Sequence, residues 1–421
     1  MTLRHRDVAQ LGSALPWGGR GRQFKSDRSD HLIKTDSKFR VLFICNGLLM
    51  TKILSYNLSF LIIETSNYSY SEVVMKQLKH LMLCSVAFLA MTVTGCNNNN
   101  GPVEDSNEVS VFVLSGQSNM EGNTSFKNGT TDLIAQAFKD MELEGSDVCV
   151  NGINEVQLSS YCVDYGKLDH TNLNNSRVNA TNAEDKFAGK FVPTKAGYGL
   201  NNTKMGPEVG CAYALREEAS EEKPIFFIKM ASGGSGFEQG DTQYNWPVKD
   251  ADGNWPEINM YHCFCKPFVE NNLRLIEAQG FKPVIKGWLW HQGESDTAQS
   301  KIDKYAQRLG DMVELFRTDF AQYAKDENGA NIAFVDGMIY QGEGTAWGAQ
   351  TSVNMNNVKK QFAESADNNY LVDIYGNQEE TAANELKPGS PGGDSMHYNV
   401  PSILKLGMGY AKVILDNNLL D

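Results

Sequence analysis

Cysteine is scarce in this chain, which has 8 cysteines and 12 prolines in 421 residues. A framework this sparse cannot hold a fold together, so the folded part must depend on a hydrophobic core. Cys149 and Cys162 are close enough in sequence to form a disulfide across a short loop in an oxidising compartment. Cys263 and Cys265 have the wrong spacing for a zinc ribbon and no second pair nearby, so we expect no metal site.

Positive charge is also in short supply. The chain has 38 Lys and Arg against 51 Asp and Glu, a formal net charge of −13, and the acidic excess lies after the first 95 residues. This balance disfavours nucleic acid and anionic lipid as partners and favours neutral or cationic ligands. No internal repeat is visible, and we expect a single large α/β domain over 108–421.

The chain lacks an apolar run that could span a bilayer unaided. The run from Leu81 to Val93 is too short for this; it follows Lys76 and Lys79 and ends at Val93-Thr94-Gly95-Cys96. This pattern resembles a bacterial lipoprotein signal, with a buried core helix as the alternative. The resemblance predicts a signal peptide over 75–95, lipidation of Cys96, a polar tether over 96–107, and export to the periplasm, outer membrane or cell surface.

Residues 1–74 lie upstream of that signal. The stretch VAQLGSALPWGGRGRQFKSDRSDH resembles the conceptual translation of a transfer-RNA gene. We therefore expect 1–74 to be spurious upstream translation, and we give its basic residues no role in binding nucleic acid.

Short apolar runs alternate with helical periods along the rest of the chain. The runs that predict strands are 109–116, 224–234, 283–293, 330–340 and 368–376, and the helical periods are 208–219, 260–280, 301–325, 351–366 and 401–416. Val-rich runs of this kind are typical of strands buried on both faces of a parallel sheet. The alternation predicts a three-layer α/β/α sandwich, in which ligands bind at the carboxyl ends of the strands. The polar stretch 145–204 is expected to be a surface insertion.

Two polar motifs follow predicted strands. Ser118 stands in Ser115-Gly116-Gln117-Ser118-Asn119-Met120-Glu121-Gly122, a tight turn that can expose a serine hydroxyl above the sheet. A helix cap or a phosphate-binding loop would look the same. The second motif, Trp290-His291-Gln292-Gly293-Glu294-Ser295-Asp296, crowds a histidine, an amide and two carboxylates at a strand end, although it also fits a polar helix start.

A third motif, Asp394-Ser395-Met396-His397, precedes the last helical period. A carboxylate three residues before an imidazole can accept its Nδ1 proton and leave Nε2 free to take a proton from a serine. Taken alone, this pattern is common.

Together and in this order, GQSNMEG, WHQGESD and DSMHYN resemble the sialate O-acetylesterase and acetylxylan esterase group, carbohydrate esterase family six. That group is a branch of the SGNH hydrolases, so the resemblance implies their flavodoxin-like fold. It implies a serine esterase without a cofactor that acts on O-acetyl esters of an acetylated glycan.

The resemblance also implies the roles of individual residues. Ser118 would be the nucleophile, His397 the base and Asp394 the orienting acid, with Glu294 as a rival or assistant to that acid. The oxyanion would be held by the N–H of Ser118, by Gly234 in preference to Gly233, and by the Gln292 amide. Asn119 and His291 would support the site.

Several alternatives stay open at this point. The chain could be a lipase, a thioesterase or a peptidoglycan deacetylase of the same superfamily, or a glycan-binding lipoprotein without catalysis. The segment Gly206-Pro207-Glu208 matches the family pattern but also reads as a helix start. Tyr244, Trp246 and Trp255 either stack on sugar rings or pack within the protein.

Overall fold

The computed structural model describes residues 107–163, 168–174, 178–238, 244–326, 328–342, 348–374 and 387–421. These residues belong to one compact unit, Asn100–Asp421. The expected upstream segment, the signal peptide, Cys96 and nearly all of the tether lie outside the described residues. Within the described ranges, no helix is both long and apolar enough to cross a bilayer.

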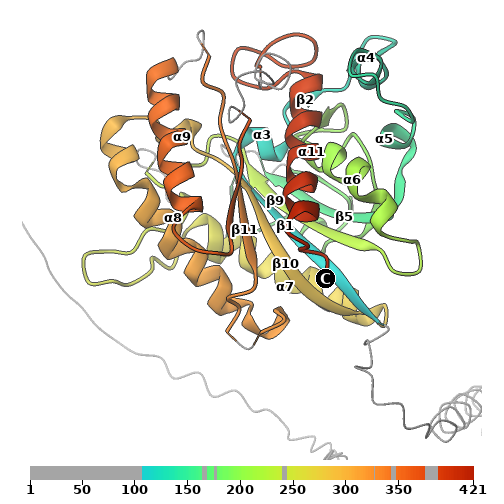
Figure 1. Cartoon of the computed structure of the whole chain (residues 1–421). Coiled ribbons are helices and arrows are strands. Elements are labelled where there is room, and N and C mark those ends of the chain that lie inside the picture. Colours follow the sequence, from blue (N-terminus) through green and yellow to red (C-terminus); the bar gives the residue numbers. More distant parts are fainter. Residues whose placement is uncertain are drawn as a thin grey trace, which may run out of the picture. The chain divides into compact units, whose positions relative to one another are not determined.

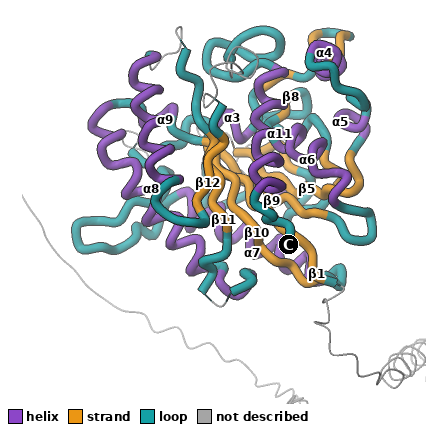
Figure 2. The backbone as a smooth tube through the Cα atoms, in the orientation of Figure 1, coloured by secondary structure: helices purple, strands orange, loops and turns teal. Residues whose placement is uncertain are grey.

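The centre of the unit is a largely parallel sheet with the strand order β12-β11-β10-β1-β9-β5-β6, and β7 pairs with β5 (Figure 2). Strands β6 and β7 are antiparallel to β5, whereas the neighbours from β12 to β5 run parallel. The strands are β1 Glu108–Gly116, β5 Ile153–Val163, β6 Val178–Ala180, β7 Val192–Thr194, β9 Ile225–Ser232, β10 Lys282–His291, β11 Ala333–Gly337 and β12 Asn369–Val372. Two small pairs lie apart from the sheet: β2 Thr124–Ser125 with β8 Lys204–Met205, and β3 Lys127–Asn128 with β4 Thr131–Asp132.

Helices cover both faces of the sheet. In Figure 1, α6 and α11 lie in front of the sheet and α7 lies behind it. The helices are α3 Ser118–Glu121, α4 Leu133–Asp140, α5 Val148–Asn151, α6 Glu208–Leu215, α7 Lys266–Ala278, α8 Gln299–Asp319, α9 Ala349–Ala363 and α11 Val400–Asp416, and a π-helical turn, Tyr261–Cys265, leads into α7. The predicted three-layer α/β/α arrangement is confirmed.

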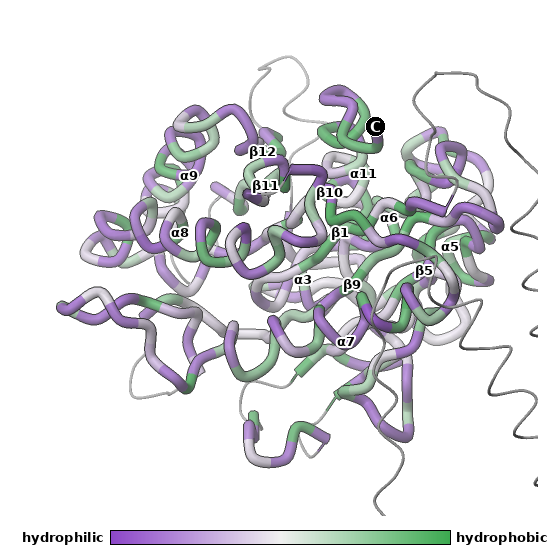
Figure 3. The backbone as a smooth tube through the Cα atoms, turned by 90° about the horizontal axis from the view of Figure 1, so that it is seen from below, coloured by the Kyte–Doolittle hydropathy of each residue, from purple (hydrophilic) through white to green (hydrophobic). Residues whose placement is uncertain are grey.

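Strand β1 shows why this sequence forms a buried parallel sheet. Successive side chains of a strand point to opposite faces, so Val111 and Val113 join one core while Phe112 and Leu114 join the other. All four are fully buried, and Figure 3 shows hydrophobic residues gathered along β1 and β9. The apolar run is continuous because both faces are covered by helices.

The structure corrects the prediction that 145–204 is a surface insertion. This stretch contains β5, a strand of the main sheet that is paired in parallel with β9. Polar residues interrupt the apolar run of this strand, so the sequence pattern did not predict it. Ser159 and Ser160 are fully buried; the Ser159 hydroxyl accepts a hydrogen bond from Lys190 N at 3.2 Å, and the Ser160 hydroxyl donates to Tyr198 O at 3.2 Å. Buried hydroxyls with partners cost little, so the strand does not need an unbroken apolar run.

The structure also decides between a disulfide and free thiols for Cys149 and Cys162, which the sequence left open. Cys149 and Cys162 are separate buried thiols, and the Cys162 thiol donates to the Glu121 carbonyl at 3.3 Å. Burial raises the pKa of Cys149 to about 12 and that of Cys162 to about 11. Both cysteines therefore act as small core residues.

Helices α6 and α11 touch through two glycines. A Cβ atom on Gly407 would lie 2.1 Å from the Pro207 carbonyl oxygen, and one on Gly210 would lie 2.2 Å from the Leu404 carbonyl oxygen. No side chain fits at such distances, so glycine permits the two backbones to approach. The N-terminus of α11 is capped by Asn399, whose side chain accepts from Ser402 N at 3.0 Å.

The first prediction concerns this helix contact. Gly407→Ala should lower the free energy of unfolding by up to about 2 kcal/mol, because an overpacking cost of about 1–3 kcal/mol outweighs the gain of about 1 kcal/mol in helix propensity. Urea denaturation measures the change. Gly310→Ala on α8 is the matched control, because its Cβ would meet only the Phe362 ring at 3.4 Å, and it should leave stability unchanged or raise it. Equal responses of the two variants would contradict the argument.

Candidate active site

Three strand ends meet at one edge of the sheet. Gly116 ends β1 and stands opposite Ala231 of β9 and His291 of β10. Because these strands run parallel, the segments that follow them leave the sheet side by side. The Ser118 turn, the turn after Ser232 and the motif after His291 are therefore neighbours, as the sequence predicted for a parallel sheet.

The Ser118 turn depends on two glycines. Gly116 has φ +146°, and a Cβ there would lie 2.1 Å from the His291 carbonyl oxygen. Gly122 has φ +98° and ends α3, and a Cβ there would lie 2.5 Å from Gly206 N. Only glycine satisfies both demands. The turn places Ser118 at the first position of α3, half-buried at the edge of the sheet.

The glycine turn after β9 lies against Ser118. A Cβ on Gly233 would stand 3.4 Å from the Ser118 Cβ and 2.8 Å from Glu121 Oε2. Gly234 adopts φ +75°, and its carbonyl oxygen accepts a hydrogen bond from the Ser295 hydroxyl at 3.3 Å. Gly233 is thus the residue in close contact with the serine, while Gly234 turns the chain toward the β10 motif.

Asp394 and His397 pair as the sequence predicted from their spacing. The Asp394 Oδ2 atom lies 2.8 Å from His397 Nδ1, and Oδ1 accepts from the N–H groups of Met396 at 2.8 Å and His397 at 3.0 Å. Burial would raise the pKa of Asp394, but the hydrogen bonds from His397 and Met396 outweigh it and lower that pKa. The pairing uses Nδ1 and leaves Nε2 of His397 for another partner.

Hydrogen bonds tie the segment that carries His397 to the segment that follows Ser118. Tyr398 N donates to Asn119 Oδ1 at 3.2 Å, and the Thr124 hydroxyl donates to the Tyr398 carbonyl at 2.7 Å. Residues next to Ser118 and next to His397 are therefore directly bonded. This contact brings together two motifs that are almost 280 positions apart.

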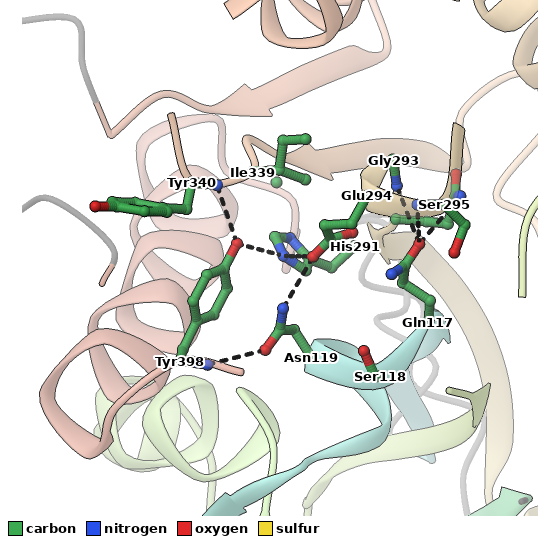
Figure 4. A network of polar contacts seen from close by, with 12 residues as sticks. Gln117, Ser118, Asn119, His291, Gly293, Glu294, Ser295, Ile339, Tyr340 and Tyr398 are labelled. Carbon is green, nitrogen blue, oxygen red and sulfur yellow. Dashed lines mark hydrogen bonds and ion pairs between the residues drawn. The ribbon is translucent and has the colours of Figure 1, made fainter. Parts of the chain in front are cut away.

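Figure 4 shows the buried network behind this contact. Asn119 Nδ2 donates to Glu294 Oε1 at 2.9 Å, and His291 Nε2 lies 3.6 Å from the same oxygen and 3.1 Å from the Tyr398 hydroxyl. Burial would raise the pKa of Glu294, but His291 and Asn119 outweigh it and lower that pKa to about 2. Glu294 thus binds Asn119 and faces His291, while Asp394 partners His397. His291 is fully buried, which fits a packing role.

The position of Gln292 departs from its predicted role. Its side chain is fully buried, and Nε2 donates to Asp296 Oδ2 at 2.7 Å, to Gln117 Oε1 at 3.2 Å and to the Ser235 carbonyl at 3.4 Å. Its Oε1 accepts from the Tyr305 hydroxyl at 2.9 Å. In this arrangement the Gln292 amide has no N–H left for a substrate oxygen.

An ion pair beneath the Ser118 turn could not be predicted from the apolar pattern of β9. Lys229 Nζ lies 2.9 Å from Glu208 Oε1, with both side chains fully buried, and also donates to the carbonyls of Glu121 at 3.2 Å and Tyr198 at 2.8 Å. A lysine inside an apolar strand requires a buried acid. The presence of Lys229 in this apolar run was therefore the one feature of the sequence that indicated a buried ion pair. Glu208, the first residue of α6, is that acid.

Two of the three aromatic residues considered for sugar stacking pack inside the protein. Tyr244 and Trp246 are buried, and the Trp246 ring lies 4.7 Å from that of Trp290. Trp255 is half-buried, with Lys249 Nζ 5.0 Å from its ring centre. Across the described part of the chain, no group of three or more His, Cys, Asp or Glu side chains could hold a metal ion.

The second prediction concerns acid stability. The Glu294 pKa of about 2 lies below its ordinary 4.5, so its carboxylate contributes stability above pH 4.5 that is lost as the pH falls toward 2, up to about 3 kcal/mol. Glu294→Gln keeps an acceptor for Asn119 but removes the titration, so unfolding free energy should vary less between pH 5 and pH 3 than in wild type. Urea denaturation tests this, with exposed Glu314→Gln as control. An unchanged slope in Glu294→Gln would refute it.

Comparison with known proteins assigns the chain to a family. The sequence model of the family described as "Carbohydrate esterase, sialic acid-specific acetylesterase" matches residues 108–416. None of the curated proteins matches the chain.

Solved structures show weaker likenesses. NanS is 15% identical, covering 74% of this chain and 98% of its own, with a TM-score of 0.45. A protein from Arabidopsis thaliana is 17% identical. The match covers 73% of this chain and 98% of that protein, with a TM-score of 0.40. A carbohydrate acetylesterase from Xanthomonas citri is 16% identical. The match covers 73% of this chain and 56% of that protein, with a TM-score of 0.39. The family assignment rests on the sequence match over 108–416: this chain belongs to the sialic acid-specific acetylesterase family of carbohydrate esterases and is an enzyme that hydrolyses acetyl esters of sugars.

Proposed function

We propose that Ser118, His397 and Asp394 form the catalytic triad of this esterase. The observation that supports it best is the pair of hydrogen bonds that connects the motifs. Asp394 Oδ2 lies 2.8 Å from His397 Nδ1, and Tyr398 N donates at 3.2 Å to the side chain of Asn119, the residue after Ser118. A histidine held by an acid in a loop bonded to a serine turn is the arrangement that activates a hydroxyl.

The reaction follows the acyl-enzyme route. Ser118 Oγ forms a bond to the acetyl carbon, its proton passes to His397 Nε2, and the π electron pair of the carbonyl moves onto the oxygen. Collapse of this tetrahedral species breaks the bond to the sugar oxygen, which receives the proton from His397. A water molecule activated by His397 then releases acetate and restores the serine.

Backbone N–H groups of the Ser118 and Gly234 turns are the proposed donors to the oxyanion. Both turns stand at the edge where β1 and β9 end. Gly233 contributes by letting its turn reach the serine without a side chain in the way. Such donors are fixed before the substrate arrives, so they need no reorganisation as charge develops.

The substrate class is an O-acetylated glycan of the sialic acid or acetylxylan type. The family match supports an acetyl ester of a sugar. Acetate release from O-acetylated sialic acid and from acetylated xylan, compared at equal enzyme concentration, would separate these two candidates.

The third prediction tests the nucleophile. Ser118→Ala should lower kcat/KM for a small aryl acetate by at least about 1000-fold, the scale expected when a serine nucleophile is removed. Spectroscopic release of the phenol measures it. Ser365→Ala, at an exposed serine after α9, is the matched control and should match wild type. Retained activity in Ser118→Ala would show that another group is the nucleophile.

The fourth prediction tests the membrane anchor. The pattern Val93-Thr94-Gly95-Cys96 after a short apolar run supports lipidation of Cys96 after removal of a signal peptide over 75–95. The protein expressed in a bacterium with an alkyne fatty acid should carry the label, and Cys96→Ser should not. Equal labelling of the two proteins, or none in either, would contradict the anchor.

A further inference from the structure

Lys204 lies beside the loop that carries the proposed acid and base. It belongs to β8 and stands opposite Ser125 of β2, whose N–H group donates to the Gly392 carbonyl at 2.8 Å. Gly392 comes two residues before Asp394 in the loop that precedes α11. Strand β2 therefore lies between Lys204 and the loop that presents His397.

The ammonium group of Lys204 also reaches the serine turn. Its Nζ atom donates to the Asn123 carbonyl at 2.7 Å. The side chain of Asn123 in turn donates from Nδ2 to the Ser118 carbonyl at 3.1 Å and to Glu121 Oε2 at 3.0 Å. Asn123 is buried, whereas Lys204 is half-buried. A single residue thus connects the ammonium to the backbone of the nucleophile and holds it at the edge of the site.

This ammonium has hydrogen-bonding capacity to spare. A lysine ammonium carries three N–H donors, and among the described residues Lys204 Nζ has one acceptor, the Asn123 carbonyl. In the same part of the chain no carboxylate lies within ion-pairing distance of Nζ, whereas Lys229 is paired with Glu208 at 2.9 Å. Burial lowers the pKa of Lys204, and the charge of Asp394 only partly offsets this effect. A cation that has lost part of its hydration and has no carboxylate partner is stabilised by an anionic ligand.

The charge of the whole chain makes a contact of this kind necessary for an acidic substrate. The formal net charge is −13, so the protein as a whole repels an anion, and at physiological ionic strength charges act over only about 8 Å. An acidic sugar must therefore be held by a cation at contact distance. Lys204 places such a cation next to the nucleophile, although the acidic balance disfavours anionic ligands over the surface in general.

We propose that Lys204 binds the carboxylate of an acidic sugar while Ser118 attacks an acetyl group of the same molecule. The inference rests on the proposed function and deepens it, because it chooses between the two candidate substrates. Sialic acids carry a carboxylate, whereas the xylose units of acetylated xylan carry no charge. The carboxylate accepts hydrogen bonds from Nζ in place of water, and charge-assisted bonds are about twice as strong as neutral ones. Lys204 is thus a specificity-determining residue.

A matched pair of substrates tests this role. Acetate release is measured for O-acetylated N-acetylneuraminic acid and for the methyl ester of its carboxylate, which has the same acetyl group without the charge. In wild type, kcat/KM for the free acid should exceed that for the ester by about 10-fold or more, the scale of a hydrogen bond to a charged group. Lys204→Met should bring this ratio down to about 1–2, and Lys204→Arg, which keeps a cation, should retain most of it. Because the ratio is taken within each variant, a general loss of activity cancels.

Lys127→Met, at an exposed lysine of β3, is the matched control and should keep the wild-type ratio. Acetylated galacturonan, another source of sugar carboxylates, is compared with its methyl ester in the same way. The acid with the higher kcat/KM in wild type identifies which acidic sugar the site takes. A wild-type ratio near 1 for both acids, or a ratio that survives Lys204→Met, would overturn the proposal.

A binding measurement gives a second readout, because the carboxylate needs the cation but not the nucleophile. The dissociation constant of N-acetylneuraminic acid, or of galacturonic acid if that sugar is preferred, is measured by calorimetry in Ser118→Ala. Adding Lys204→Met should raise it by about 10-fold, and an unchanged constant would contradict the carboxylate site. Aryl acetate activity that survives Ser118→Ala would instead overturn the proposed function, so the two failures are distinguishable. Thermal unfolding checks that each variant is folded.

Discussion

The site depends on how closely β1 and β10 lie where they leave the sheet. At Gly116 the backbone of β1 passes so near the His291 carbonyl that a Cβ would lie 2.1 Å away, and Gln117 N donates to that carbonyl at 3.0 Å. The serine turn therefore starts from a fixed point on the neighbouring strand. The close approach of the two strands thus fixes the positions of the short helix α3 and of the contacts that Gln117 makes.

A second level of organisation joins segments that the sheet alone would not bring together. Side-chain bonds connect the loop before α11 to the serine turn, with Asn119 as the central residue: its oxygen accepts from Tyr398 N and its nitrogen donates to Glu294. An amide is suited to this, because it offers a donor and an acceptor on one rigid group. The buried carboxylate of Glu294 then orients the amide, so Asn119 has one orientation.

Much of the fold could be predicted from the sequence, since β1, β9, β10, β11 and β12 are short apolar runs and alternate with helices. The strand β5 could not, because Ser159 and Ser160 interrupt its apolar pattern and their hydroxyls find partners within the protein only in the folded state. The pairing of Asp394 with His397 was readable because it is local, three residues apart. The orientation of the Gln292 and Gln117 side-chain amides could not be predicted, because it is decided by hydrogen bonds from three segments that are distant in sequence.

The ion pair of Lys229 and Glu208, fully buried beneath the serine turn, also restricts how this sequence can change over time. Replacing either partner alone leaves an uncompensated charge in the interior, at a typical cost of about 3–5 kcal/mol, whereas replacing both by apolar residues is often neutral. The two positions stand 21 residues apart on different elements, so no single substitution leads from one tolerated state to the other. Descendants of this protein should therefore keep the pair intact or lose it as a unit, and homologues that carry only one of the two charges should be rare.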